Sequence, residues 1–375
     1  MTVAYLDHAA TTPMRPEAVA AMLPFLTEHF GNPSGSHAVA RRAKAALEDA
    51  RDEVATALGC APGEVVFTAG GTEADNLAIA GVVGRVGGRP ACPATEHHAV
   101  LLTTEAFGGV VLPVGPAGVV DLDAMREVLA GGGLSVVSVM LANNEVGTIQ
   151  PLEAVVDLVR EVSPATAVHT DAVQAFPWMD VASAAAGADL VAVSAHKFGG
   201  PKGVGALVVR GGRKIDPILH GGGQESERRS GTHNLAGIVA MAAAMTATVA
   251  SRAETVERVA ALRDRLVDEI VAAVPDAVET GARDAKIAGN AHLCFPGVES
   301  ETLLFLLDEA GVCASAGSAC ASGAIEVSHV LVAMGVPDVE ARGSLRLSLG
   351  TTTTSDEIDL AVKAVAGAVA RLRGA

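Results

Sequence analysis

The chain has 375 residues, half of them hydrophobic, which is enough to bury a large core divided between two domains. Its 27 Lys and Arg residues are outnumbered by 43 Asp and Glu residues, so the net charge is −16. This acidic balance argues against a nucleic-acid-binding surface, which needs a concentrated basic face. The eight Phe, one Tyr and one Trp are also too few for an extended platform on which bases could stack.

The sequence gives no sign of export or membrane insertion. Its N-terminus has neither the basic nor the apolar segment of a secretory signal. The longest uncharged apolar run, residues 235–250, is shorter than the roughly 20 residues of a membrane span, and we interpret it as a buried or interface helix. Five cysteines without a Cys-x-x-Cys pair indicate neither a disulfide framework nor a zinc site. We therefore expect a cytoplasmic protein without a membrane contact.

Helices and strands are predicted to alternate along the first part of the chain. An amphipathic helix over residues 38–58 ends at Gly59, a plausible C-cap. Short β-branched strands then alternate with helices, which is typical of a mostly parallel sheet covered on both faces. The predicted strands span residues 65–68, 110–113, 135–141, 167–170, 190–193 and 206–209. The predicted helices between them include residues 72–83, 121–129 and 152–162.

The pattern changes after residue 213. A glycine-rich loop over residues 220–232 leads into a long helix from Asn234 to about residue 273. The elements predicted beyond it are a strand at 292–295, a helix at 301–310, a strand at 345–349 and a final helix with the capping box Thr354–Glu357. We therefore predict an α/β protein with a large domain over 13–255 and a smaller α+β domain over 256–375. Residues 1–12 are grouped with the smaller domain, although they would suit either.

Polar groups follow several predicted strands. Gly71 and Thr72 offer backbone N–H groups and a hydroxyl at the positive end of a helix, which suits a phosphate, although a plain helix cap explains them as well. His97 and His98 also follow a strand. Because adjacent side chains point to different faces, these two rarely bind one metal, and either could be a capping or surface histidine.

Six lysines give a short set of candidate amine nucleophiles. Lys197 follows the most apolar strand, and a desolvated lysine can form a Schiff base. Its only rival, Lys202, lies in a predicted turn. The remaining four are interpreted as surface residues: Lys44, Lys214, Lys286 and Lys363. Asp171 and Gln174 follow the strand at 167–170, where a buried Asp is either a structural cap or the counter-ion of a ring nitrogen. Together with the phosphate-binding turn, these groups indicate pyridoxal phosphate, bound at the carboxyl ends of the strands.

Motifs along the whole chain resemble the cysteine desulfurases, pyridoxal-phosphate enzymes of the class V aminotransferase family. The matching stretches run from Tyr5-Leu-Asp-His-Ala-Ala-Thr-Thr-Pro13 to Arg346-Leu-Ser-Leu-Gly350. Ser194-Ala-His-Lys197 is shared across class V. The segment Ala316-Gly-Ser-Ala-Cys320-Ala-Ser is more specific: it resembles the persulfide-forming loop of the NifS/IscS-like group rather than the Arg-x-Gly-His-His-Cys pattern of the other group.

This resemblance implies a fold-type I transferase, with a role for each residue that matches the family motifs. Lys197 would carry the cofactor through a Schiff base, while Asp171 would bind the pyridinium N–H and Gln174 the ring oxygen. His97 would stack on the ring and relay protons. The cofactor phosphate would be bound by Gly71, Thr72, Ser194 and His196, and by Thr232 from the neighbouring subunit of a homodimer. The substrate carboxylate would be bound by Arg346, with Asn144 beside the ring.

The resemblance also implies the reaction. The amine of Lys197, displaced by L-cysteine, would remove the Cα proton, and the Cys320 thiolate would attack the substrate sulfur. The products would be L-alanine and a Cys320 persulfide, which passes to an acceptor such as an iron–sulfur scaffold. The other four cysteines are interpreted as small buried apolar residues: Cys60, Cys92, Cys294 and Cys313. The chain ends at Ala375 soon after the last helix, whereas some relatives continue into a tail implicated in scaffold docking.

Three alternatives remain open on the sequence. The protein could be a selenocysteine lyase or another class V aminotransferase, and an ordinary aminotransferase would have no need of Cys320. It could also be a non-catalytic sulfur-trafficking platform that keeps the fold, although the intact motif residues argue against this. The sulfur acceptor is equally open, because iron–sulfur assembly, tRNA thiolation and cofactor sulfuration use similar donors.

Overall fold

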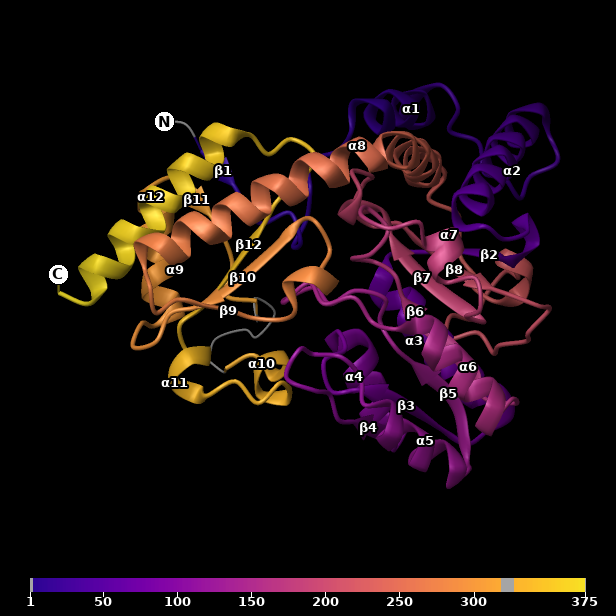
Figure 1. The fold of residues 1–375 in the computed structure, drawn as a ribbon. Helices are drawn as coiled ribbons and strands as arrows, with labels where there is room; N and C mark the ends of the chain where they lie inside the picture. The colour runs from indigo at the N-terminus through magenta and orange to yellow at the C-terminus, as the bar shows by residue number, and fades with distance from the viewer. Residues whose placement is uncertain (1–2, 318–326, 375) are drawn as a thin grey trace.

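The computed structural model describes residues 3–317 and 327–374. These residues form two regions joined by one long helix, α8 (Leu235–Ala273) (Figure 1). The larger region holds a seven-stranded sheet, and the smaller one, which contains the C-terminus, holds a three-stranded sheet. This architecture confirms the predicted α/β fold class.

The seven-stranded sheet is mostly parallel. Its strands, in spatial order, are β2 (Val65–Thr68), β8 (Gly205–Val209), β7 (Leu190–Ser194), β6 (Ala167–Asp171), β5 (Leu134–Ser138), β3 (Arg89–Pro93) and β4 (Val110–Leu112). Only β8 runs antiparallel to its neighbours, β2 and β7. The remaining pairs are parallel, so the carboxyl ends of β3, β5, β6 and β7 lie along one edge of the sheet.

Helices cover both faces of this sheet, which explains why its strands are apolar throughout. The helices of the larger region are α1 (Pro16–Thr27), α2 (Ala38–Leu58), α3 (Gly71–Val86), α4 (His98–Ala106), α5 (Leu122–Ala130), α6 (Leu152–Val162) and α7 (Val181–Ala184). Successive strand residues enter different cores because side chains alternate across a sheet. Val66 and Leu207 pack with α3 and α4, whereas Val65, Phe67 and Val208 pack with α2 on the opposite face.

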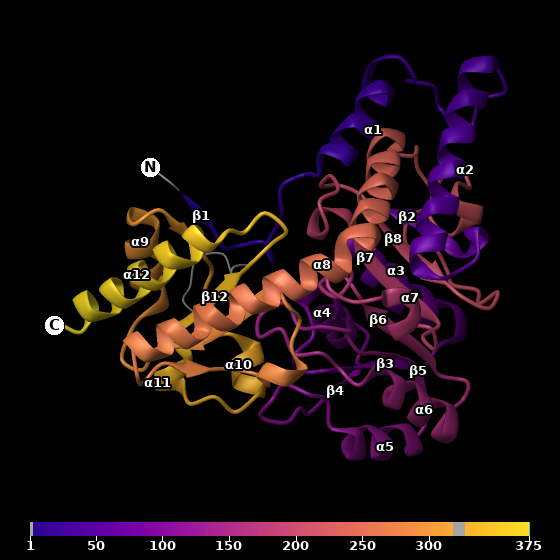
Figure 2. The ribbon, with the colours of Figure 1, turned by 45° about the horizontal axis from the view of Figure 1, so that its top comes forward.

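Helix α8 belongs to both regions. Its first half packs against α1 and α2, and its second half packs against the small region, as Figure 2 shows. By length and composition alone, α8 is the one helix in the described residues that could cross a membrane, yet 56% of its most apolar window is buried inside the protein. The buried helix predicted for residues 235–250 is therefore what the structure contains. The domain boundary expected near residue 255 falls within α8 and stays a prediction.

The small region is built around a short antiparallel sheet. Its strands are, in order, β12 (Ser344–Ser348), β10 (Asn290–Cys294) and β9 (Val278–Glu279). Its helices are α9 (Ser300–Glu309), α10 (His329–Ala333), α11 (Asp338–Ala341) and α12 (Ser355–Leu372). The N-terminal strand β1 (Ala4–Tyr5) pairs in parallel with β11 (Val312–Cys313), and Leu6 is buried in the same core. The chain thus begins against the small region before it enters the large one.

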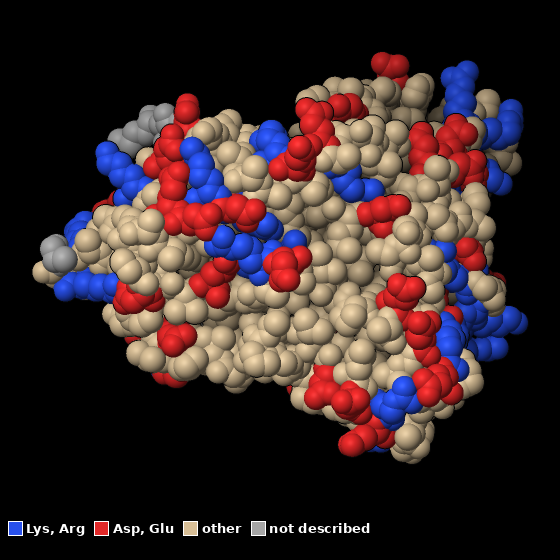
Figure 3. All heavy atoms as spheres, in the orientation of Figure 1, with Lys and Arg blue, Asp and Glu red and all other residues tan. Residues whose placement is uncertain are grey.

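Charged side chains of both signs are distributed over the surface. On the face drawn in Figure 3, Asp and Glu are interspersed with Lys and Arg around the periphery, and uncharged atoms cover much of the centre. One predicted surface lysine is not on the surface. Lys286 is buried. Its Nζ donates to Glu279 Oε1 at 3.0 Å and to the Thr280 carbonyl at 2.9 Å, and these two partners replace the water that a surface lysine would bind.

Candidate active site

A cavity of about 390 Å³ lies at the carboxyl edge of the central sheet, with walls from both regions. Ten of the twelve predicted site residues line it: Gly71, Thr72, His97, Asn144, Asp171, Gln174, Ser194, His196, Lys197 and Arg346. Parallel strands bring these residues together because each ends at the same edge. Arg346 is the exception, since it comes from β12 of the small region.

One end of the cavity is formed by the first turn of α3. Gly71 begins this helix, and its N–H groups and the Thr72 hydroxyl therefore lie at the positive end of the helix. A Cβ on Gly71 would come within 2.9 Å of Val173 Cγ2, so only glycine fits here without a shift. Ser194 and His196 face the same end from β7 and the turn after it. Burial lowers the pKa of His196 to about 4, so its imidazole is neutral.

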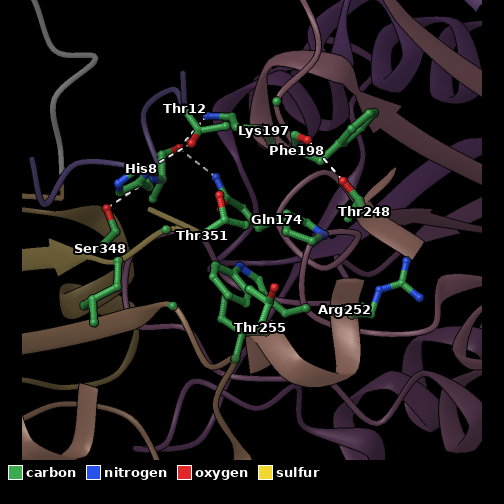
Figure 4. Close-up of a pocket in the computed structure, with 18 of the residues that line it drawn as sticks. His8, Thr12, Gln174, Lys197, Phe198, Thr248, Arg252, Thr255, Ser348 and Thr351 are labelled. Carbon is green, nitrogen blue, oxygen red and sulfur yellow. Dashed lines mark hydrogen bonds between the residues drawn. The ribbon is translucent and has the colours of Figure 1, made fainter. Parts of the chain in front are cut away.

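Lys197 is the last residue of a short turn, Ala195–Lys197, that directly follows β7. Its Nζ donates to the carbonyl oxygens of Ala9 and Ala10, at 2.5 and 2.9 Å. Gln174 Nε2 donates to the same Ala9 carbonyl at 2.9 Å, and Figure 4 shows the two nitrogens converging on this point. Lys202, by contrast, is exposed in a turn outside this cavity. The amine that reaches the cavity is therefore that of Lys197.

Asp171 ends β6 and lies on the cavity wall. Its Oδ1 accepts the backbone N–H of Val173 at 2.8 Å. Burial raises the pKa of this carboxyl, and the Val173 N–H and the Lys197 amine counteract the rise. A cationic ring nitrogen in the cavity would also lower the pKa of Asp171 and so hold its carboxyl ionised.

His97 caps the N-terminus of α4. Its Nδ1 accepts the Ala99 N–H at 3.1 Å, so the neutral ring carries its proton on Nε2. Burial lowers the pKa of His97, which keeps the ring neutral near pH 7. His98, the next residue, stacks on His329 of α10 with ring centroids 4.4 Å apart. The prediction that the two adjacent histidines point to different faces is only partly met, because the rings make separate contacts but both residues line the same cavity, with ring centroids 6.5 Å apart.

Arg346 reaches the cavity from the middle of β12 and is 3% exposed. Its Nη1 donates to the Asn144 carbonyl at 3.0 Å, and its Nη2 donates to Asp7 Oδ1 at 2.9 Å. A buried guanidinium with donors to spare is suited to a carboxylate. The cavity thus has a helix N-terminus at one end, an amine and a buried acid in the middle, and an arginine from the other region.

Residues 4–361 match the family model described as Aminotransferase class-V. The chain belongs to this family. It is 45% identical to an IscS-like cysteine desulfurase of Mycobacterium tuberculosis, over 100% of this chain and 98% of that protein. It is 41% identical to the cysteine desulfurase IscS of Dictyoglomus turgidum, over 98% of this chain and 95% of that protein. A solved NifS-like protein superposes with a TM-score of 0.91 at 34% identity, covering 98% of this chain and 99% of the other.

These findings confirm the resemblance to the NifS/IscS-like cysteine desulfurases within the class V aminotransferases, a family that depends on pyridoxal phosphate. Two predicted residues are not among those that line the cavity. Thr232 is exposed in the loop before α8, and its expected contribution to a neighbouring subunit stays a prediction. Cys320 lies outside the described residues, so its expected role also stays a prediction.

Several residues of this class V site were not predicted. Asp75 is 1% exposed and lines the cavity, and its Oδ1 lies 3.6 Å from His169 Nε2. The spacing of Asp75 in the sequence could have indicated this position, because a residue four places after Gly71 lies on the same face of the helix. Asp7 was noticed only as part of a motif. No local pattern indicates its contact with Arg346, because 339 residues separate the two.

The four described cysteines are only partly as predicted. Cys92 and Cys294 are buried, but Cys60 and Cys313 are half-buried. Cys60 follows the end of α2 and Cys313 lies in a two-stranded sheet, so neither is enclosed on all sides. Burial raises the pKa of Cys60 to about 11 and of Cys294 to about 12, and raises that of Cys92 and Cys313 as well. All four are therefore thiols rather than reactive thiolates at neutral pH.

Proposed function

We propose that the protein is a pyridoxal-phosphate-dependent cysteine desulfurase that converts L-cysteine to L-alanine and passes the sulfur to its own Cys320. One observation carries this proposal: Lys197, Asp171 and Arg346 line one cavity in a chain that matches cysteine desulfurases over its full length. An amine, a buried acid and a carboxylate-binding group are what the chemistry of an amino acid on this cofactor requires.

The residues present fit the cofactor. The Gly71 turn leaves no room for a Cβ and presents N–H groups to a phosphate, and Asp171 is a buried acid that a ring N–H would satisfy. Lys197 would hold the cofactor covalently, and His97 would cover one face of the ring. When bound, pyridoxal phosphate supplies an electron sink for the pair released from the substrate Cα.

The side chains of the cavity then have separate tasks. Arg346 binds the α-carboxylate and so orients the substrate, and Lys197 Nζ takes the proton from Cα. His97 holds a proton on Nε2, from which it can be donated to a group on the substrate. A positive charge at the ring nitrogen would favour the ionised form of Asp171, which compensates that charge in turn.

The sulfur step is assigned to Cys320. Its thiolate Sγ would attack the substrate sulfur, so that an S–S bond forms as the Cβ–S bond breaks. The electron pair of the broken bond stays on the carbon skeleton, which takes up a proton and leaves as L-alanine. The persulfide would then pass to an acceptor protein, such as an iron–sulfur scaffold. We further propose a cytoplasmic homodimer in which Thr232 of one subunit completes the phosphate site of the other.

The test is Cys320→Ala in the purified, coloured protein, compared with Cys60→Ala. We expect Cys320→Ala to keep the visible absorbance of the cofactor and to lose production of alanine and sulfide from L-cysteine. Cys60→Ala, which removes a thiol that does not line the cavity, should match the wild type. Desulfuration by Cys320→Ala at the wild-type rate would contradict the proposed mechanism. Turnover of selenocysteine with poor turnover of cysteine would favour the selenocysteine lyase instead.

A further inference from the structure

The segment over residues 7–12 connects several parts of the candidate site. Its carbonyls at Ala9 and Ala10 accept the Lys197 amine, and Ala9 also accepts Gln174 Nε2. At its start, the carboxylate of Asp7 accepts from Arg346 Nη2 at 2.9 Å. One short segment therefore contacts both the amine that would act on the substrate and the guanidinium that would bind its carboxylate.

The backbone of Asp7 is held in place by several contacts. It forms a parallel bridge with Ser348, two residues beyond Arg346 on β12. Its carbonyl accepts from the Tyr5 hydroxyl at 3.2 Å and from the Ala10 N–H at 3.1 Å. The Asp7 carboxylate therefore approaches Arg346 from a fixed position, and a change in its side chain leaves these backbone contacts intact.

Arg346 has a counter-charge in this carboxylate. Its side chain is 4% exposed, and a buried guanidinium without a counter-charge is costly. Glu145 is another carboxylate residue on the cavity wall, but it is engaged by the Ser328 hydroxyl at 2.5 Å. Asp7 is thus the acid that pairs with Arg346 in the described part of the chain.

The pairing also leaves donors for a substrate. A guanidinium has five N–H groups, and Asp7 and the Asn144 carbonyl each take one from a different Nη. The second N–H on each Nη remains, and so does Nε–H, which has no partner among the described residues. With two partners on two nitrogens, the plane of the guanidinium is fixed while a fork of donors stays available.

We propose that Asp7 is a positioning residue that gives this site its specificity for an α-carboxylate, because it fixes the guanidinium plane of Arg346. The proposal rests on the proposed function, in which Arg346 binds the carboxylate of an amino acid substrate. Without the Asp7 carboxylate, the guanidinium can turn about its side-chain torsions, so substrate binding loses the contact to the carboxylate but keeps the contacts to the amine.

The test uses Asp7→Asn in the cofactor-loaded protein with two ligands. L-cysteine carries the carboxylate and cysteamine lacks it, and the change in cofactor absorbance gives a dissociation constant for each. We expect Asp7→Asn to raise the dissociation constant of L-cysteine by at least about tenfold and that of cysteamine by less than about threefold. The KM for L-cysteine should rise similarly, with kcat changed by less than about threefold.

Asp276→Asn is the matched control, because Asp276 pairs with Arg373 at 2.8 Å on the surface, away from the cavity. It should leave the ratio of the two dissociation constants unchanged. If Asp7→Asn weakens both ligands equally, or weakens neither, the proposal is wrong. Should Asp7→Asn fail to fold, Asp7→Ser removes the same charge and is judged by the same ratio. A wild-type protein that binds no L-cysteine would contradict the proposed function instead.

Discussion

The two sides of the candidate site are built in different ways. On the cofactor side, Gly71, Asp171 and Lys197 each lie at a strand end or a helix start of the large region. On the substrate side, Arg346 lies in the middle of a strand of the small region and is oriented by groups from distant parts of the chain. The cofactor side therefore follows from local sequence, whereas the substrate side follows from the assembly of the two regions.

This difference bears on how each side should respond to change. A group at the end of a parallel strand is positioned by the whole central sheet, so a single substitution removes its chemistry and leaves the frame in place. A guanidinium whose plane is fixed by two distant partners loses that fixed orientation when one of them is removed. The cofactor side should therefore fail through lost chemistry, and the substrate side through lost specificity.

The largest expected effect is on the cofactor side. Lys197→Ala removes the amine that would hold the cofactor and take the Cα proton, so we expect loss of the visible absorbance and a fall in activity of about 10³-fold. Lys202→Ala removes an exposed lysine from a neighbouring turn and should keep both. Absorbance scans with and without borohydride, together with alanine production, measure the two effects. Equal loss in both variants would assign the chemistry to the wrong lysine.

The sequence was most informative where chemistry and secondary structure coincide. Lys197, Asp171 and His97 all follow strands, so their grouping at one sheet edge could be predicted from topology alone. The helix over Ala38–Leu58 was also predicted to its end, because Gly59 adopts the left-handed conformation that ends it (φ 62°). Strand β3 (Arg89–Pro93) was expected only as the strand that precedes His97 and His98, and its bounds were not predicted.

The remaining contacts could not be predicted because no periodic pattern indicates them. Lys286 was interpreted as a surface lysine because its partner Glu279, seven residues earlier, reaches it only through the turn between them. Asp7 was noticed only as one residue of an N-terminal motif, because its partner Arg346 is 339 residues away. Long-range pairs of this kind leave no periodic signal in a single sequence, so the cofactor side was predicted more completely than the substrate side.

Buried histidines on both sides should make stability depend on pH. His169 lies behind the cofactor side, and His292 lies opposite Arg346 on the neighbouring strand β10. Burial lowers the pKa of each histidine to about 3. The unfolded chain takes up these protons near pH 6.5, whereas the folded protein does not until about pH 3. The stabilisation is therefore complete above pH 6.5 and is lost as the pH falls, by about 1.4 kcal/mol per pH unit for each histidine.

Denaturant unfolding between about pH 5 and pH 6.5 measures this slope. His292→Gln should lower the slope of the unfolding free energy against pH by the contribution of one histidine, and His169→Gln should do the same. Each variant also loses a hydrogen bond, from Thr280 or Ser138, but that loss shifts the whole curve and leaves its slope unchanged. A slope equal to that of the wild type in either variant would mean that its histidine is already charged in the folded protein.

The smallest expected effect comes from a second buried acid on the cofactor side. Asp75 lines the same cavity as Asp171, and burial together with the charges of Asp171 and Glu96 raises its pKa well above the usual range. Burial therefore favours the neutral form of the Asp75 carboxyl. Asp75→Asn replaces this acid with a neutral amide of similar shape, so we expect cofactor affinity to change by less than about threefold.

Asp171→Asn is the matched comparison, because it removes the charge that would face the ring nitrogen. We expect it to displace the pH titration of the cofactor absorbance, whereas Asp75→Asn should leave that titration in place. If the two variants displace it equally, Asp75 is ionised and the cofactor side carries two negative charges. Two buried carboxyls on one cavity cannot both ionise cheaply, so we expect a single charge there, on Asp171 at the end of β6 rather than on Asp75 in α3.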